Sequence, residues 1–137
     1  MRTNLIMGFD FGTKKIGVAI GQMVTATATP ISIIRVENGV PNWCVLEELI
    51  NQWKPERFVV GLPLNMDDSS SNMSRRAIWF SSELVKRFGI AVSNVDERLS
   101  TFEARQILKD GAAKSRQGDL DDKVAALILE SWLRDRI

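Results

Sequence analysis

The sequence contains no histidine and no tyrosine, and its only cysteine is Cys44. The absence of histidine excludes Ser-His-Asp and Cys-His nucleophilic catalysis and every histidine-ligated metal site. A single cysteine cannot form an internal disulfide, which fits a reducing cytoplasm. The remaining chemistry is that of carboxylates, lysine, hydroxyls and hard metals with oxygen ligands. Mg²⁺ and Mn²⁺ are therefore the ions to expect, and zinc is not.

Long hydrophobic runs and a strong net charge are also absent. No apolar run approaches the roughly 20 residues of a membrane span, and no signal-peptide pattern begins the sequence, so we expect a cytoplasmic protein without a membrane partner. The net charge of +1 provides no global field for nucleic acid, so such binding would need a local patch. Lysine and arginine are unevenly distributed, with 6 in residues 1–70 and 12 in residues 71–137.

Hydrophobic periodicity predicts one domain, residues 1–137, with strands and helices in the order three strands, helix, strand, helix, strand, two helices. The strands are expected at Leu5–Phe9, Lys15–Gly21, Thr25–Val36, Arg57–Leu62 and Ile90–Val95. The helices are expected from Pro41 to just before Pro55, and at residues 72–88, 100–110 and 119–134. Three antiparallel strands followed by βαβ-type units indicate an α/β fold, with a mixed five-stranded sheet and helices on both faces.

Local packing can also be predicted. Pro30 interrupts the third strand, which indicates an edge position or a bulge. Trp43 and Cys44 are interpreted as packing residues of the first helix. In the second helix, the residues expected to face inward are Ala77, Phe80, Leu84, Val85 and Phe88.

Three acidic residues interrupt segments that otherwise read as core. Asp10 ends the first strand, Glu97 follows the fifth, and Asp121 shares the sheet-facing stripe of the last helix. Simpler explanations remain for Asp10 and for the acids at the start of the last helix. Asp10 could be a turn residue that caps backbone amides. Acids at a helix N-terminus are stabilised by the helix dipole, which explains Asp119 and Asp122 better than Asp121.

Converging carboxylates repel one another, and a divalent metal would reverse that repulsion and could align a water on a phosphodiester. Basic residues near these acids are candidates for phosphate contacts, although each alone reads as a surface charge. They are Lys14, Lys15, Arg75, Arg76, Arg98, Lys114, Arg116 and Lys123. The arginines in the first turn of the second helix oppose its dipole, so a nearby anion would explain them better than helix stability does.

Four segments, in order and over nearly the whole chain, closely resemble the YqgF family. They are Gly8–Ala19 (GFDFGTKKIGVA), Val60–Asp67 (VGLPLNMD), Asp96–Thr101 (DERLST) and Leu120–Ala126 (LDDKVAA). The resemblance implies a ribonuclease H-like fold similar to that of Holliday-junction resolvases. It further implies a nuclease that processes the 5′ end of pre-16S ribosomal RNA, with an acidic triad of Asp10, Glu97 and Asp121. One departure is Asp68, where the family usually has glycine, which adds negative charge to a loop expected near substrate.

The leading hypothesis is a metal-dependent nuclease acting on structured RNA, specifically pre-16S rRNA. A Holliday-junction resolvase acting on branched DNA is the alternative enzyme, and a non-cleaving assembly factor is the non-enzymatic one. An actin-like or sugar-kinase ATPase needs two domains of this kind, which 137 residues do not supply. Ribosomal particles are further candidate partners, and the chain is expected to be a monomer or weak homodimer.

The composition also predicts the mechanism. Without histidine or tyrosine, we expect hydrolysis by metal-activated water and no covalent enzyme intermediate. Asp10 is expected to be the central ligand, since a strand buried on both faces places it rigidly. Lys14 or Lys15 would stabilise negative charge on the phosphate in the transition state.

Overall fold

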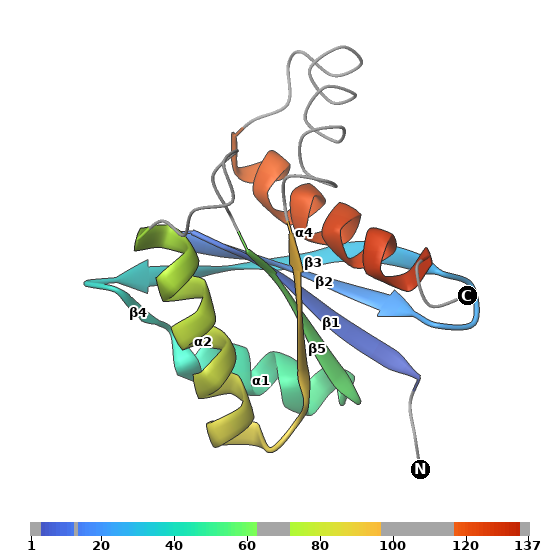
Figure 1. Ribbon diagram of the computed structural model, residues 1–137, viewed down its shortest axis with the longest axis horizontal. Coiled ribbons are helices and arrows are strands. Elements are labelled where there is room, and N and C mark those ends of the chain that lie inside the picture. The colour runs from blue at the N-terminus through green and yellow to red at the C-terminus, as the bar shows by residue number, and fades with distance from the viewer. Residues whose placement is uncertain (1–3, 13, 63–71, 97–116, 135–137) are drawn as a thin grey trace.

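A six-stranded mixed sheet forms the centre of the computed structural model, which describes residues 4–12, 14–62, 72–96 and 117–134 (Figure 1). The strands are β1 (Leu5–Phe11), β2 (Lys15–Gln22), β3 (Thr27–Glu37), β4 (Val40–Pro41), β5 (Arg57–Leu62) and β6 (Val92–Asp96). The helices are α1 (Trp43–Trp53), α2 (Asn72–Phe88) and α4 (Gln117–Arg134). For Asn72, Met73, Asp96 and residues 117–123 only the backbone is described.

The strand order is β4-β3-β2-β1-β5-β6. Strands β1 to β4 pair antiparallel, and β1, β5 and β6 pair parallel. The predicted mixed sheet is therefore confirmed, with one strand more than expected. The register of β2 with β3 shifts between Val18 and Ala19, opposite Pro30, and β4 does not extend that far along β3. Both the bulge and the edge position predicted from Pro30 are confirmed.

The additional strand, β4, corrects the predicted start of the first helix. Pro41 pairs with Val36 in β4 and does not begin α1. The helix begins instead at Trp43, where the Asn42 side chain accepts a hydrogen bond from the Val45 backbone N–H at 3.3 Å. A two-residue strand has no period that a sequence pattern can reveal, and proline is also common in the first turn of helices. The pattern therefore favoured the wrong assignment.

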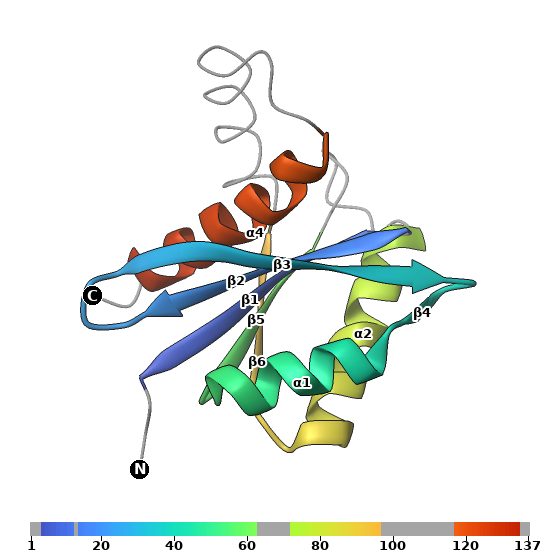
Figure 2. The same cartoon turned by 180° about the vertical axis from the view of Figure 1, so that it is seen from behind.

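Two hydrophobic clusters cover the two faces of the sheet. Helices α1 and α2 pack on one face, and α4 crosses the other (Figures 1 and 2). Side chains alternate along β1, so that Met7, Phe9 and Phe11 belong to the α1/α2 side while Ile6 belongs to the α4 side. This strand is buried on both faces, as its apolar sequence predicts.

Two packing predictions are wrong. Val85 is 47% exposed, because the buried stripe of α2 runs through Ala77, Phe80 and Leu84 and leaves the next residue on the flank of the helix. Cys44 is exposed, whereas its neighbour Trp43 packs against the core as expected. Both errors come from extending an apolar stripe by one position on a helix that covers only one face of the sheet. The helix predicted at residues 100–110 lies outside the described residues.

Candidate functional site at the carboxyl edge of the sheet

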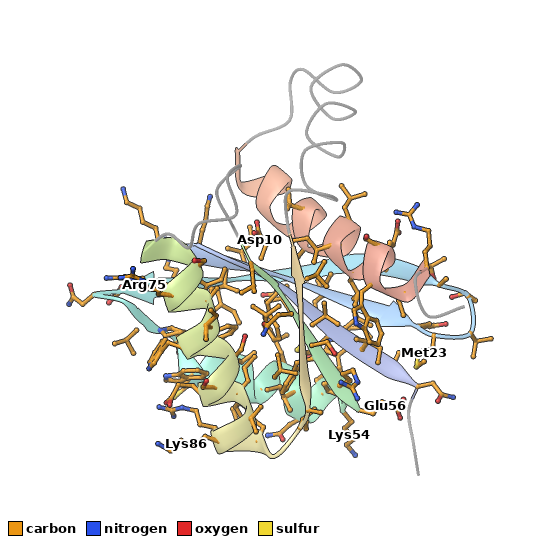
Figure 3. The ribbon with its side chains drawn as sticks, in the orientation of Figure 1. Asp10, Met23, Lys54, Glu56, Arg75 and Lys86 are labelled. Carbon is orange, nitrogen blue, oxygen red and sulfur yellow. The ribbon has the colours of Figure 1, made fainter. Side chains whose placement is uncertain are left out.

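Asp10 is the next-to-last residue of β1 and is half-buried. Because Phe9 and Phe11 face α1 and α2, alternation directs Asp10 to the opposite face, which α4 covers. Its partner in β2 is Gly17, which has no side chain to cover the carboxylate from that side. The strand therefore presents a carboxylate at the carboxyl edge of the sheet, beside a position without a side chain (Figure 3).

The N-terminal half of α4 extends toward Asp10. A Cβ placed at Gly21, beside the start of β1, would meet both Leu129 and Leu133, whereas a Cβ at Gly8 would meet Leu129. The residues of β1 that are closer to Asp10 therefore lie under residues of α4 that are closer to its N-terminus. Glycine at these two positions allows the helix to lie directly on the strands, with Leu129 Cβ only 3.0 Å from where a Gly8 Cβ would be.

For the two other predicted acids, Asp121 and Glu97, the structure describes less than it does for Asp10. Two strand residues and four helix residues each advance about 6 Å. Counting from Leu129, which lies over Gly8, Asp10 therefore lies toward Ala125, and the backbone of Asp121 lies one further turn toward the N-terminus of α4. The side chain of Asp121 is not described, and Glu97, which directly follows the last residue of β6, lies outside the described residues. Leu62 pairs with Asp96, so β5 and β6 end at the same edge as β1.

The turn after Asp10 is shaped by Gly12. A Cβ at this position would lie 2.6 Å from the Lys15 carbonyl oxygen, a distance that real Cβ atoms do not show. Glycine is therefore required here by a close backbone approach. The Lys14 carbonyl accepts a hydrogen bond from the Val36 backbone N–H at 2.9 Å, which ties this turn to β3.

The predicted phosphate-binding cations fall into two groups. Lys14 is exposed, Lys15 is half-buried in β2, and Arg75 and Arg76 are both exposed in the first turn of α2. The Arg76 guanidinium lies against the β3–β4 turn, since Nη1 would be 3.2 Å from a Cβ placed at Gly39. Arg98, Lys114 and Arg116 lie outside the described residues, and the side chain of Lys123 is not described.

One exposed aromatic residue was not singled out by the sequence analysis. Trp79 of α2 is 41% exposed and lies one turn after Arg75 and Arg76. Its neighbours Ala77 and Phe80 belong to the buried stripe, so helical periodicity alone was enough to place Trp79 outside it. A tryptophan outside the buried stripe and one turn from two arginines is therefore a signal that the sequence itself carries.

The described donors suit a hard divalent cation. The chain can supply no histidine, and the one predicted ligand whose side chain is described, Asp10, is a carboxylate. Among the side chains that the structure describes, which do not include those of Asp96 and residues 117–123, no group of three or more acidic or cysteine residues could hold a metal ion. The three-carboxylate metal site therefore stays a prediction. In the part of the chain that the structure describes, no helix is both long and apolar enough to cross a membrane.

Solved structures with this fold include junction resolvases. Thermus thermophilus RuvC in complex with a Holliday junction substrate matches with a TM-score of 0.57 and 15% identity, over 96% of this chain and 94% of that one. The fowlpox virus resolvase with its Holliday junction DNA matches with a TM-score of 0.55 and 15% identity, over 97% and 99%. These similarities show that the fold is ribonuclease H-like, as the motifs implied.

Sequence relatives are much closer. A protein of Azotobacter vinelandii named "Putative pre-16S rRNA nuclease" is 47% identical over 137 residues, covering 96% of this chain and 94% of its own length. A protein of Cronobacter sakazakii with the same name is 49% identical over 129 residues, covering 93% and 94%. Residues 4–135 match the family RuvX, described as Holliday junction resolvase. The predicted class of enzyme, a nuclease that hydrolyses phosphodiester bonds, is confirmed by these matches, and the chain belongs to the RuvX family.

Proposed function

We propose that this protein is a divalent-metal-dependent nuclease that processes the 5′ end of pre-16S rRNA, with Asp10, Glu97 and Asp121 as its acidic triad. The observation that carries the proposal is the position of Asp10, which lies at the carboxyl edge of β1 on the face covered by α4. The names of the bacterial relatives support the RNA substrate. Carboxyl edges of strands are where α/β proteins place their sites.

The three carboxylates would hold Mg²⁺ or Mn²⁺. When bound, such an ion supplies activation of water for attack on phosphorus and neutralisation of developing negative charge. Asp10 fixes the position of the site, because its strand is clamped between two hydrophobic clusters. The carboxylate oxygens serve as ligands and not as nucleophiles, so no covalent enzyme intermediate forms. The chain has no imidazole, which leaves protonation of the leaving oxygen to water or to a lysine ammonium of the site.

The basic residues around this edge bind and orient the substrate. Lys14 and Lys15 follow Asp10 in the turn and at the start of β2, where they hold phosphate and stabilise charge in the transition state. Arg75 and Arg76 begin α2 at the same edge, because β5 runs parallel to β1 and α2 follows it. Arg98, Lys114 and Arg116 complete this set in the proposal.

A second candidate substrate is a four-way DNA junction. Its support is the description of the matching family and the shared fold with junction resolvases. Symmetric cleavage of a junction needs two sites facing one substrate, so this alternative requires a stable dimer. The pre-16S substrate makes no such demand, and for it we propose a cytoplasmic monomer or weak homodimer that acts on RNA within ribosomal particles.

The deciding experiment compares wild type with Asp10→Asn on labelled pre-16S RNA and on a four-way DNA junction, each with Mg²⁺, Mn²⁺ or excess chelator. We expect RNA cleavage that requires the metal. Outer-shell partners of metals are worth about 10–100-fold in activity, so loss of a ligand carboxylate should cost more than about 100-fold. RNA binding should be largely preserved. Glu47→Gln, which removes an exposed carboxylate of α1, is the matched control and should cleave at the wild-type rate.

Either of two results would contradict the proposal: full cleavage in excess chelator, or an Asp10→Asn protein as active as wild type. Cleavage of the junction but not of the RNA would favour the resolvase. Binding of the RNA without cleavage under any metal would favour the non-cleaving assembly factor.

A further inference from the structure

The outward face of α2 carries three exposed hydrophobic side chains. Ile78, Trp79 and Val85 are 46%, 41% and 47% exposed, although the helix packs its opposite side against the sheet. At about 100° per residue, Ile78 and Val85 lie on one flank of this face, and Trp79 lies about 100° further round, on the same side as Arg75 and Lys86. An exposed aromatic ring on the same side of a helix as two cations needs an explanation that single exposed hydrophobic residues would not.

Positive charge lies at both ends of this face. Arg75 and Arg76 are in the first turn of α2, and Lys86 and Arg87 are in the last. The helix has a single acidic residue, Glu83, whose Oε1 is 3.3 Å from Nε of Arg87. An exposed tryptophan with cations toward both ends of the helix, and one acid that is already paired, is complementary to an extended polyanion.

Trp79 is held in place from below. Its ring meets that of Trp43 edge-on with centroids 6.4 Å apart, and Trp43 stacks on the buried Phe80 at 5.7 Å. The guanidinium carbon of Arg87 lies 4.1 Å from the centroid of the Trp43 ring, which adds a cation–π contact to the stack. Trp79 is thus an aromatic surface anchored on a core ring and partly open to solvent.

Charge argues against a second copy of the chain as the occupant. In an antiparallel two-fold pairing of α2 helices, the arginines of the first turn would meet Lys86 of the partner copy. In a parallel pairing each basic end would meet its own equivalent. Both arrangements place cations opposite cations, and the single acidic residue of the helix cannot compensate for them.

We propose that the exposed face of α2 binds a single-stranded segment of the nucleic-acid substrate, with a base stacked on Trp79 and phosphates held by Arg75, Arg76 and Lys86. The inference rests on the proposed function. Asp10 faces the α4 side of the sheet and α2 covers the other side, so the strand that reaches Asp10 crosses the carboxyl edge before it continues along this helix. Topology brings Asp10 and the start of α2 to that edge. Helix α2 follows β5 and precedes β6, which are parallel, so it begins at the edge where Asp10 lies and leads away from it. Asp10 and Arg75 lie toward that edge and Lys86 at the far end of α2 (Figure 3).

The test measures binding of fluorescently labelled 12-nucleotide single-stranded RNA and of an RNA duplex of equal length, in the Asp10→Asn background so that no cleavage interferes. Stacking of one base predicts that Trp79→Leu weakens single-strand binding about 5- to 150-fold. Trp79→Phe keeps an aromatic face and should recover much of the affinity. Duplex binding should change much less. Arg75→Ala should reduce the salt slope of single-strand binding by roughly 0.7.

Matched controls lie elsewhere in the chain. Trp53→Phe changes a tryptophan at the far end of α1, and Arg134→Ala removes an exposed arginine at the end of α4. Both should bind as the parent does. Equal affinity of Trp79→Leu and the parent for single-stranded RNA would overturn the inference. Binding of single-stranded RNA by Trp79→Leu as tight as that by Trp79→Phe would also overturn it. An aliphatic side chain that serves as well as an aromatic one indicates an apolar contact instead of stacking.

Sedimentation at increasing protein concentration tests the remaining occupant. A dimer that Trp79→Leu dissociates would overturn the inference in favour of an interface between copies. The two proposals fail separately. If the protein with Asp10 intact does not cleave RNA, but Trp79→Leu weakens binding of single-stranded RNA, the proposed function is wrong and the role of α2 is supported. If the protein with Asp10 intact cleaves RNA, but Trp79→Leu binds single-stranded RNA as the parent does, only the role of α2 is wrong.

Discussion

Residues without side chains determine what can approach Asp10. Gly17 lies beside it in β2, and the α4 side of the same two strands continues with Gly8 and Gly21. The absence of Cβ atoms at Gly8 and Gly21 lets α4 pack closely on β1 and β2, and Gly17 places no side chain beside the carboxylate. The helix that carries Asp121 owes its position to these glycines as much as to its own apolar stripe.

Gly21→Ala should destabilise the protein by about 1–3 kcal/mol, the usual cost of overpacking a filled site. The added Cβ would lie 2.8 Å from Leu129 Cδ2 and 2.9 Å from Leu133 Cδ1, so two side chains must move at once. Alanine restricts the unfolded chain more than glycine does, which returns at most about 1 kcal/mol. Urea denaturation followed by circular dichroism gives the difference in unfolding free energy.

The Leu129→Ala background provides the control for this prediction. Removing the leucine side chain vacates the space into which the methyl group added by Gly21→Ala would project, so the two changes should be coupled by about 0.5–3 kcal/mol in a double-mutant cycle. Strictly additive effects, or a Gly21→Ala protein as stable as wild type, would show that α4 is not held this close to β2.

At the scale of elements, the start of α1 depends on one side chain. Asn42→Ala should lower the free energy of unfolding by about 1 kcal/mol, because Oδ1 of Asn42 accepts from the Val45 backbone N–H at the helix N-terminus. Asn51→Ala, an exposed change within the same helix, should cost close to nothing. Equal midpoints of thermal unfolding for the two variants would rule out a stabilising cap at Asn42.

Elements with a regular period were predictable, and those defined by pairing were not. The bounds of β5 and α2 agree with the sequence prediction, because a buried strand and an amphipathic helix each repeat over several residues. Strand β4 consists of two residues and exists only because Val36 and Glu37 lie opposite it. Which partner a short segment finds is decided by the tertiary structure, so Pro41 could not be assigned from its own sequence.

At the scale of the whole molecule, the edge on which a site forms follows from strand direction. Asp10 was predictable because it breaks an apolar strand, and the parallel strands β5 and β6 end beside it. The face of the sheet on which Asp10 lies was harder to predict, since alternation along a strand does not say which helices cover which side. The two hydrophobic clusters resolve this by placing Phe9 and Phe11 under α1 and α2.

Metal binding should be visible in the stability of the entire fold. A ligand that binds only the native state at 100 times its dissociation constant adds about 2.7 kcal/mol, which for a domain of this size raises the midpoint of thermal unfolding by about 10 °C. We expect Mn²⁺ to produce such a rise in wild type, EDTA to abolish it, and Asp10→Asn to reduce it sharply by removing one ligand charge. Glu47→Gln removes an exposed carboxylate of α1 and should respond as wild type does. Differential scanning calorimetry at constant ionic strength separates binding from general screening. An equal Mn²⁺ response in Asp10→Asn and wild type would mean that the ion binds elsewhere, and that Asp10 is the turn residue of the simpler explanation.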